Sequence, residues 1–562
     1  MAVGMSLVLL WTGCTSKAYR KRADNEVYKI VAQVEEDLFG KTSDFTIETP
    51  YTDRDPDDVS VEEIFADRDR EAEIVLSIEE AIDTAIRQSR TYQTEKEQLY
   101  LTALTLTGEK YAFSPQFFAG ASGSRERFRN GERAETLDGE AGVGQLIKTG
   151  TNVSASIATD ILEYLTGDPR RTASSTLRFS VFQPLLRGAD KVAIAESLTQ
   201  AERNVIYAVR DYSHFQNEFA KDIVIDYFRL LEQKASVINT YNDYKARQVT
   251  TNYLRARSVD REKALSVNQS EQAQLSSRNR YINSIVRYKN TLDNFKTTLG
   301  LPQTVTLKLE DAAMEELKEA GLILYDLDAR NAFRVAVEHR LPLLNAIDRY
   351  EDRQRKVRVA ADRLRAQLGI AAITSLDSQG IDDYDQFNLD DVRTTLRLSL
   401  DLPIDRLNER NSYRSSLIRF ESQLRSLSKT LDDLRSLIDR SLRELDRLKE
   451  NYRIQTNAVF LAETQVNGAL LSIEGGKAIF RDLEEAQDDL IQAQNAQTTA
   501  LVDYLSARLD LLLDLGILET TTDRFWLTEA TRFPLNTVNS EDDPEIMSLD
   551  EDVITPEELF AN

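Results

Sequence analysis

The sequence contains very little cysteine and histidine. Its 562 residues include one cysteine, Cys14, and two histidines, His214 and His339. A single cysteine excludes a disulfide framework within the chain, and the shortage of both residue types argues against a Cys/His metal site. Both histidines lie in stretches with a helical pattern, with no nucleophile or metal partner in view. We therefore predict no enzymatic activity, no metal and no cofactor.

Helix breakers are also scarce, and acidic residues outnumber basic ones by 94 to 70. The chain has 11 prolines and 21 glycines, and 29% of its residues are charged. This composition predicts long, weakly interrupted helices rather than a series of globular domains. The formal net charge of −24 argues against a nucleic-acid partner, because phosphate binding requires basic patches.

Long apolar runs are missing after Cys14. None approaches the ~18 residues of a transmembrane helix, so strands must make any membrane crossing. The short run GMSLVLLWTGC, which ends at Cys14, resembles a bacterial lipoprotein signal. We therefore interpret residues 1–14 as a lipoprotein-like signal with Cys14 as the lipidation site; a plain cleaved signal or a buried cysteine are the alternatives. Residues 15–75 are expected to form an N-terminal periplasmic segment and linker.

An alternating segment occurs twice in the chain. Thr176–Arg187 reads TLRFSVFQPLLR, and Thr395–Arg406 reads TLRLSLDLPIDR. Period-two alternation predicts a strand with two unlike faces. About 9 to 11 residues also suffice for a tilted strand to cross a bilayer, although an edge strand of a soluble sheet fits the same pattern. Pro184 and Pro403 lie where each strand should stop and bend into a helix.

Each alternating segment precedes a long helical pattern. The first extends from Ala189 to about Leu254 without proline or glycine, which corresponds to roughly 100 Å of helix. The second extends from Leu407 to about Val466, with leucines spaced mostly by threes and fours as in a coiled coil. Each helix should turn, near Ser258 and near residues 475–476, into a returning helix of about 40 residues.

These patterns define a duplicated helix-strand-strand-helix-helix unit. The first repeat covers residues 76–302, with strands at about 111–128 and 174–186 and an extra hairpin at about 141–162. The second repeat covers residues 327–518, with strands at about 367–377 and 393–403. A linker at 303–326 joins the repeats, and residues 519–562 form an acidic C-terminal tail.

Each chain therefore has about four spanning strands, or six with the extra hairpin. A closed membrane barrel needs roughly eight or more strands, since unpaired strand edges cannot remain in lipid. The barrel must then be shared between chains. The predicted fold is mostly α, with membrane β-barrel strands and long coiled-coil hairpins on one side of the membrane that continue the barrel as a helical tube.

The chain resembles the TolC-type outer-membrane efflux proteins. The resemblance covers about Leu76 to Leu518 and rests on the LSIEEAIDTAI opening, the FQPLLRG and LPIDR segments, the LGL and LGI helix ends, and the order of the duplicated elements. It implies a homotrimer in outer-membrane lipid with its helices in the periplasm. It also implies a passive conduit for efflux or type I secretion that works with a periplasmic adaptor and an inner-membrane transporter.

The resemblance and the strand pattern together indicate four site residues. In the family, acidic residues on the last returning helix narrow the periplasmic tip, and Asp482 and Glu485 match them as a periplasmic gate. Their i, i+3 spacing places both carboxylates on one helix face. Arg178 and Arg397 should face the barrel lumen if Leu177 and Leu396 face lipid, because a charge on the lipid face costs ~2 to 4 kcal/mol at midplane.

Two other classes of protein remain as alternatives. A periplasmic adaptor also contains a long helical hairpin, but it should have one hairpin flanked by halves of a lipoyl-like β-domain. A soluble coiled-coil scaffold would not need the alternating strands or their duplication.

Overall fold

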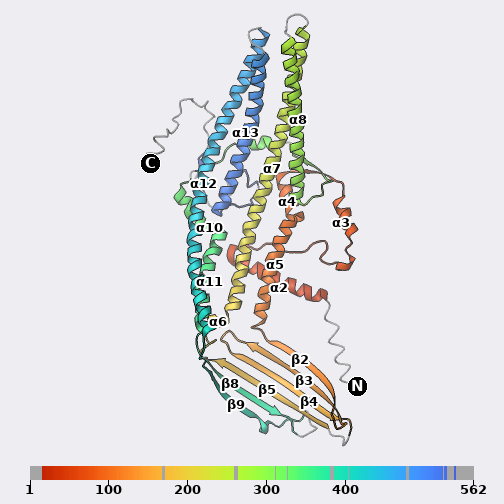
Figure 1. Ribbon diagram of the computed structural model, residues 1–562, viewed down its shortest axis with the longest axis vertical. Helices are drawn as coiled ribbons and strands as arrows, with labels where there is room; N and C mark the ends of the chain where they lie inside the picture. Colours follow the sequence, from red (N-terminus) through yellow and green to blue (C-terminus); the bar gives the residue numbers. More distant parts are fainter. Residues whose placement is uncertain are drawn as a thin grey trace. The chain divides into compact units, whose positions relative to one another are not determined.

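The computed structural model describes residues 16–166, 171–258, 264–310, 312–325, 327–379, 385–402, 404–475, 480–522, 524–527 and 537–538. The chain forms two compact units, each assembled from three segments (Figure 1). The first unit contains residues 1–47, 97–210 and 345–430, and the second contains 48–96, 211–344 and 431–562. Cys14 and Pro403 lie outside the described residues.

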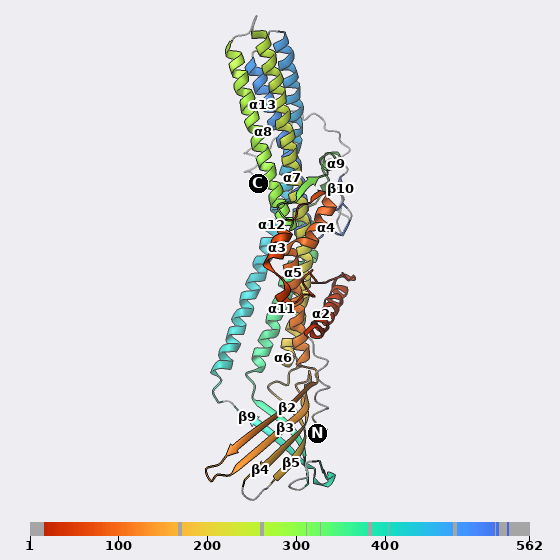
Figure 2. The same cartoon turned by 90° about the vertical axis from the view of Figure 1, so that its right-hand side faces the viewer.

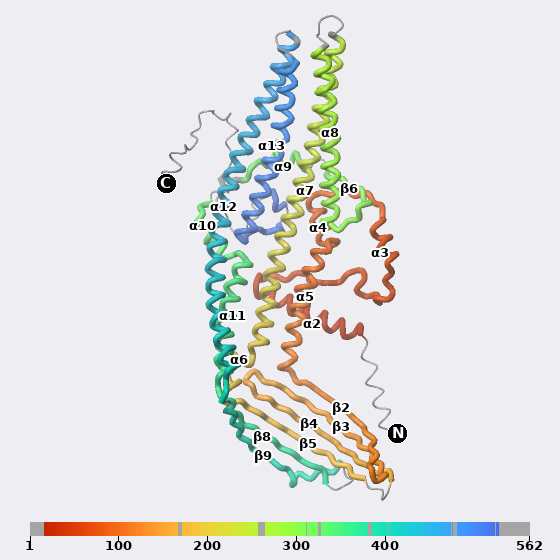
Figure 3. Tube along the Cα trace, in the orientation of Figure 1, coloured from red at the N-terminus to blue at the C-terminus, as the bar shows by residue number. Residues whose placement is uncertain are grey.

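The first unit contains a six-stranded antiparallel sheet in the order β2-β3-β4-β5-β8-β9 (Figures 1 and 3). Its strands are β2 (Gln116–Arg127), β3 (Arg133–Leu146), β4 (Asn152–Tyr164), β5 (Arg171–Pro184), β8 (Gln367–Asp377) and β9 (Arg393–Asp401). The sheet therefore combines four consecutive strands from the first half of the chain with two from the second half.

Among the described residues, the strand register places every connection to an α-helix at the same end of the sheet. At that end β2 and β8 begin, while β5 and β9 lead on into helices. The turn between β3 and β4 lies there too, because Gly150 has a φ of +83° and packs against Pro184 and Ile194. The opposite end carries the loops between strands, such as the tight turn in which Phe128 N–H donates to Glu132 O at 2.8 Å.

The helices of the first unit extend from the strand ends or pack beside those that do. They are α2 (Ser16–Phe39), most of α5 (Arg90–Tyr111), α6 (Lys191–Ile194), α11 (Leu341–Asp362), and the first parts of α7 (Glu196–Ser258) and α12 (Leu407–Glu474). The N-terminal helix α2 is fixed to α5, since the hydroxyl of Tyr100 donates to Asp24 at 2.8 Å. Figure 2 shows these helices and the sheet from a second side.

The second unit is a helical bundle with a buried aromatic and aliphatic core. Tyr227 and Phe295 meet edge-to-face, and the hydroxyl of Tyr227 donates to Leu76 O at 2.9 Å. The unit's helices are α3 (Val61–Arg68), α4 (Ile78–Gln88), the remainder of α7 and α12, α8 (Ala264–Leu299), α9 (Ala313–Ala320), α10 (Ala329–His339) and α13 (Phe480–Leu515). No helix in the described ranges is long and apolar enough to cross a membrane.

Two helix ends in this unit require glycine. Gly300 and Gly516 have φ values of +80° and +75° after α8 and α13. A side chain at Gly300 would collide with the backbone of Gln88, and one at Gly516 with the backbone of His339. Both positions therefore act as helix caps and as close contacts with the ends of α4 and α10.

Segments that the sequence indicated as linker or tail also form structure here. β1 (Glu73–Leu76) pairs in parallel with β6 (Thr306–Leu309). β7 (Leu324–Tyr325) pairs antiparallel with β10 (Thr537–Val538). Phe525 and Trp526 are buried, which places the start of the expected acidic tail in the core of this unit.

Candidate functional site

The six-stranded sheet has one apolar face and one polar face. Residues directly opposite each other on paired strands point to the same side of a sheet. Leu177 on β5 lies opposite Ile157 on β4 and Leu376 on β8. Leu396 and Leu398 on β9 lie opposite Ala372 and Ile370, which share this side by alternation. The apolar face therefore continues across the sheet.

The apolar side chains are strongly exposed in the single chain. Leu396 and Leu398 are 74% and 69% exposed, and Phe117 on the opposite edge strand is 80% exposed. A hollow of about 710 Å³ lies against the middle of the sheet, lined in part by Ile157, Leu177 and Phe179. A contiguous apolar surface of this kind marks contact with lipid or with another protein.

The other face carries the hydroxyl, carboxylate and guanidinium groups. Arg178 lies opposite Ser156 and Ser375, and Arg397 lies opposite Ala371. Ser154 and Ser180 are hydrogen-bonded across the strands at 2.7 Å. Arg178 and Arg397 are thus on the same face and opposite to Leu177 and Leu396.

The two outer strands leave their edges unpaired within the described residues. Every residue of β2 and of β9 is exposed. The two edge strands run in opposite directions, because five antiparallel pairings separate them. A β9 edge and a β2 edge from another copy could therefore form a further antiparallel ladder.

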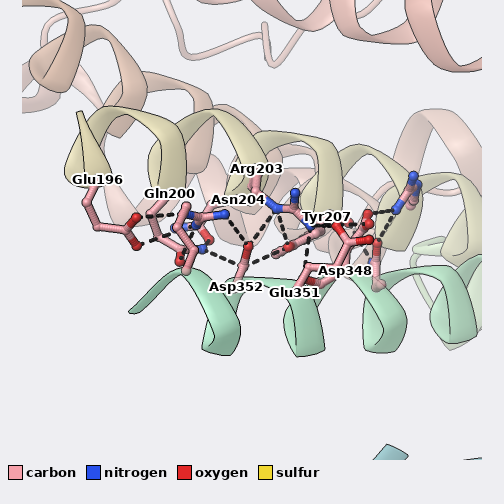
Figure 4. Close-up of polar contacts among 11 residues, drawn as sticks. Glu196, Gln200, Arg203, Asn204, Tyr207, Asp348, Glu351 and Asp352 are labelled. Carbon is pink, nitrogen blue, oxygen red and sulfur yellow. Dashed lines mark hydrogen bonds and ion pairs between the residues drawn. The ribbon is translucent and has the colours of Figure 1, made fainter. Parts of the chain in front are cut away.

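A polar network joins α7 to α11 in the first unit (Figure 4). Asp352 is 4% exposed and accepts hydrogen bonds from Tyr207 at 2.8 Å and Gln200 at 3.0 Å. It also forms ion pairs with Arg203 at 2.6 Å and Arg355 at 3.0 Å. These side chains recur at helical spacing on facing surfaces of the two helices, so the network determines how the helices align.

The network shifts the pKa values of its members. Burial alone would raise the pKa of Asp352, but the hydrogen bonds from Tyr207 and Gln200 and the two arginine charges lower it. Burial, together with the hydrogen bond to Asp352, raises the pKa of Tyr207 to about 12. Asp352 is therefore ionised and Tyr207 neutral at physiological pH.

The predicted gate residues lie in the first turns of α13. Asp482 and Glu485 are both exposed, whereas Leu483 and Ala486 beside them are buried. Three residues further on, Asp488 forms ion pairs with Arg247 of α7 at 2.7 Å and Arg280 of α8 at 3.0 Å.

The sequence alone predicted neither the ion-pair cluster around Asp488 nor the network around Asp352. The only sequence signal was the helical spacing of residues such as Gln200, Arg203 and Tyr207, which does not identify the partner helix.

Comparison with known proteins finds similarity at the level of the fold. No protein-family model and no curated protein sequence matches the chain. Among solved structures, the outer membrane protein VceC of Vibrio cholerae is 15% identical, with a TM-score of 0.58 over 78% of this chain and 96% of its own.

Two outer membrane channels are similarly close. CmeC of Campylobacter jejuni is 12% identical, with a TM-score of 0.56 over 78% of this chain and 85% of its own. MtrE of Neisseria gonorrhoeae, solved in an open state, is 13% identical, with a TM-score of 0.56 over 78% and 88%. The chain has the fold of these outer-membrane proteins, as the sequence resemblance predicted.

Proposed function

We propose that this chain, which shares the fold of solved outer-membrane channels, is itself an outer-membrane channel for efflux or secretion. The observation that carries the proposal is the six-stranded sheet, which has one apolar face and one polar face and whose described connections to α-helices all lie at one end. Such a sheet can place its apolar face against lipid and its polar face against an aqueous lumen. The helices would then lie together on the periplasmic side.

The barrel would be completed by identical copies. A six-stranded sheet leaves two edges, and an unsatisfied backbone group costs several kcal/mol in lipid. Pairing β9 of one copy with β2 of the next removes both edges when the ring closes. Three copies of six strands give eighteen, within the range of bacterial outer-membrane barrels.

The two arginines support this orientation. Arg178 and Arg397 share the polar face, so they would line the lumen while Leu177 and Leu396 contact lipid. Placing an arginine at midplane on the lipid face costs about 2 to 4 kcal/mol. Cys14 would carry the lipid anchor.

The helical part would act as a periplasmic tunnel. It would receive cargo from an inner-membrane transporter through a periplasmic adaptor, and Asp482 and Glu485 would form stacked acidic rings at the tip of a homotrimer. Such rings attract cations and narrow the opening. Replacing both residues, Asp482→Asn with Glu485→Gln, should raise single-channel conductance and abolish block by cations; the same exchange at exposed Glu62 and Glu63 of α3 should change neither.

Membrane extraction and planar-bilayer recording test the proposed function. We expect the protein in the outer-membrane fraction, as a heat-modifiable trimer that forms water-filled channels. A soluble adaptor or scaffold would instead appear in periplasmic extract without channel activity, and that result would refute the proposal.

A further inference from the structure

A groove in the second unit is lined with arginine. It lies between α12 and α13, has a volume of about 590 Å³, and is lined by Leu437, Arg440, Ser441, Arg443, Glu444, Arg447, Ala507 and Asp510. Three of these residues are arginines spaced three and four apart, so they share one face of α12. Leu437 and Ala507 add an apolar floor.

Two of the arginines have no carboxylate partner among the described residues. Arg447 is paired with Glu444 at 2.6 Å, and Asp510 is paired with Lys221 at 2.6 Å. Arg440 donates to the carbonyl of Ser436 at 3.2 Å, and within the described ranges neither Arg440 nor Arg443 forms an ion pair. In a chain of net charge −24, this groove therefore offers unneutralised positive charge.

The end of the chain has the complementary chemistry. Residues 540–559, SEDDPEIMSLDEDVITPEEL, contain nine acidic residues and no lysine or arginine. Apolar side chains such as Ile546, Met547 and Leu549 lie between the acidic residues of 541–545 and those of 550–552. We refer to this stretch as the acidic tail.

The last described residues before the acidic tail belong to the same unit as the groove. Val538 of β10 pairs with Leu324 of β7 in an antiparallel ladder. The chain after Val538 therefore continues in the direction of Ile323, the residue before Leu324. The carbonyl of Ile323 accepts a hydrogen bond of 2.7 Å from Tyr504 on α13. Ala507 of the groove is three residues further along α13, an axial rise of about 4.5 Å. The acidic tail with Asn539 comprises 21 residues after Val538 and would span up to about 70 Å if extended, so it is long enough to reach the groove.

We propose that the acidic tail of the chain binds in the arginine groove of the same chain. Carboxylates of the tail pair with Arg440 and Arg443, and its apolar residues cover Leu437 and Ala507. The guanidinium group accepts a carboxylate through two parallel hydrogen bonds, which favours this pairing over one with lysine. The bound tail bridges α12 and α13, which are the helices on either side of the groove.

Peptide binding to detergent-solubilised protein tests the interaction. A fluorescent peptide of residues 540–559 is titrated into the full chain and into a chain that ends at Asn539. We expect saturable binding to the shortened chain, and at least about tenfold weaker binding to the full chain, whose own tail occupies the groove. Raising the salt from about 50 to about 500 mM should weaken binding, since it shortens the Debye length.

Charge variants identify the groove. Arg440→Glu with Arg443→Glu in the shortened chain should weaken peptide binding by about tenfold or more. A peptide with lysine in place of its acidic residues should bind this variant and restore the interaction. The matched control is Arg453→Glu, also exposed on α12 but outside the groove, which should bind as well as the parent.

A disulfide test identifies whose tail is bound. Ser441→Cys combined with Ser548→Cys should, after oxidation, give a cross-linked species that denatures to a single chain. Linked dimers would overturn the proposal in favour of a tail from another copy. The proposal would also be overturned if the peptide bound the full and the shortened chain with equal affinity. Equal affinity for the Arg440→Glu, Arg443→Glu variant and the Arg453→Glu control would overturn it too. Tail docking does not require channel activity, so neither result bears on the proposed function.

Discussion

Asp352 is a single buried carboxylate that forms ion pairs with two arginines and accepts hydrogen bonds from a tyrosine and a glutamine. Removing one member of a buried ion-pair network leaves the others uncompensated, at a cost of about 3 kcal/mol. We therefore expect Asp352→Asn to lower the free energy of unfolding by that amount, as measured by thermal denaturation of solubilised protein.

The control for Asp352 is an exposed carboxylate. Asp83 on α4 pairs with Arg87 at 2.6 Å, with both side chains more than half exposed. Such surface pairs contribute about 0 to 1 kcal/mol, so Asp83→Asn should have a small effect. Equal losses in the two variants would show that the α7–α11 network does not stabilise the protein.

A second single residue, His214, is expected to make the stability of the protein depend on pH. Burial, with Arg340 and Lys221 nearby, lowers its pKa below the ordinary value of 6.5, although Glu218 and Asp211 act in the opposite direction. The unfolded chain then binds a proton more readily than the folded chain. The stability that His214 provides is complete above pH 6.5 and decreases as the pH falls through 6.5 toward the lowered value.

We expect the denaturation temperature to fall between about pH 7.5 and about pH 5.5, and to fall less in His214→Gln. The matched control is His339→Gln, which leaves His214 in place and should keep the parental pH dependence. An identical pH profile for the parent and His214→Gln would contradict this assignment.

At the scale of elements, the extra hairpin determines the width of the sheet. Strands β3 and β4 are inserted between β2 and β5, which would be antiparallel neighbours without them. Deleting residues 133–170 should therefore leave a complete four-stranded sheet. Because barrel diameter grows roughly linearly with strand number, the barrel should narrow by about a third.

Single-channel conductance measures this change. The deletion variant should form channels of clearly lower conductance than the parent, while Lys148→Ala at the hairpin turn should leave conductance unchanged. Channels of equal conductance would show that the hairpin does not line the barrel. Loss of channels from the deletion variant together with normal trimer assembly would show that its four strands cannot close a barrel.

The elements that the sequence predicted well are those with a local signal. The alternation at Leu396 to Leu402 predicted a strand, and β9 covers Arg393–Asp401. The mostly helical fold with a sheet region is confirmed. The sequence did not indicate the break between α4 and α5 at Ser89, where Gly300, more than 200 residues away in the chain, packs against the backbone of Gln88. The parallel pair β1–β6 was missed for the same reason.

The site residues also divide into those that a local sequence pattern predicts and those that depend on contacts between distant segments. Strand alternation alone placed Arg178 and Leu177 on opposite faces. The partners of Asp352 and Asp488 depend on which helices face each other, and spacing within one helix does not determine that. The roles of Cys14, Asp482 and Glu485 stay predictions.

At the scale of the whole molecule, ring closure requires pairing between copies. Cysteines at Thr395 of β9 and at Ser122 or Ser124 of β2, all on the polar face, should form disulfides between chains and give linked products up to a trimer. Ser154→Cys with Ser180→Cys is the control, because these positions lie opposite each other within one chain. A β9–β2 disulfide within one chain would show instead that each copy closes its own sheet.

The tight turn from Phe128 to Glu132 lies at the end of the sheet opposite the strand ends that connect to α-helices. In an outer-membrane channel this end of the sheet is exposed to the extracellular medium. The turn is then the part of the protein that an antibody or a bacteriophage encounters on an intact cell. An epitope tag inserted after Asn130 should be stained on living cells without permeabilisation, whereas a tag in the turn at Thr149 should require it.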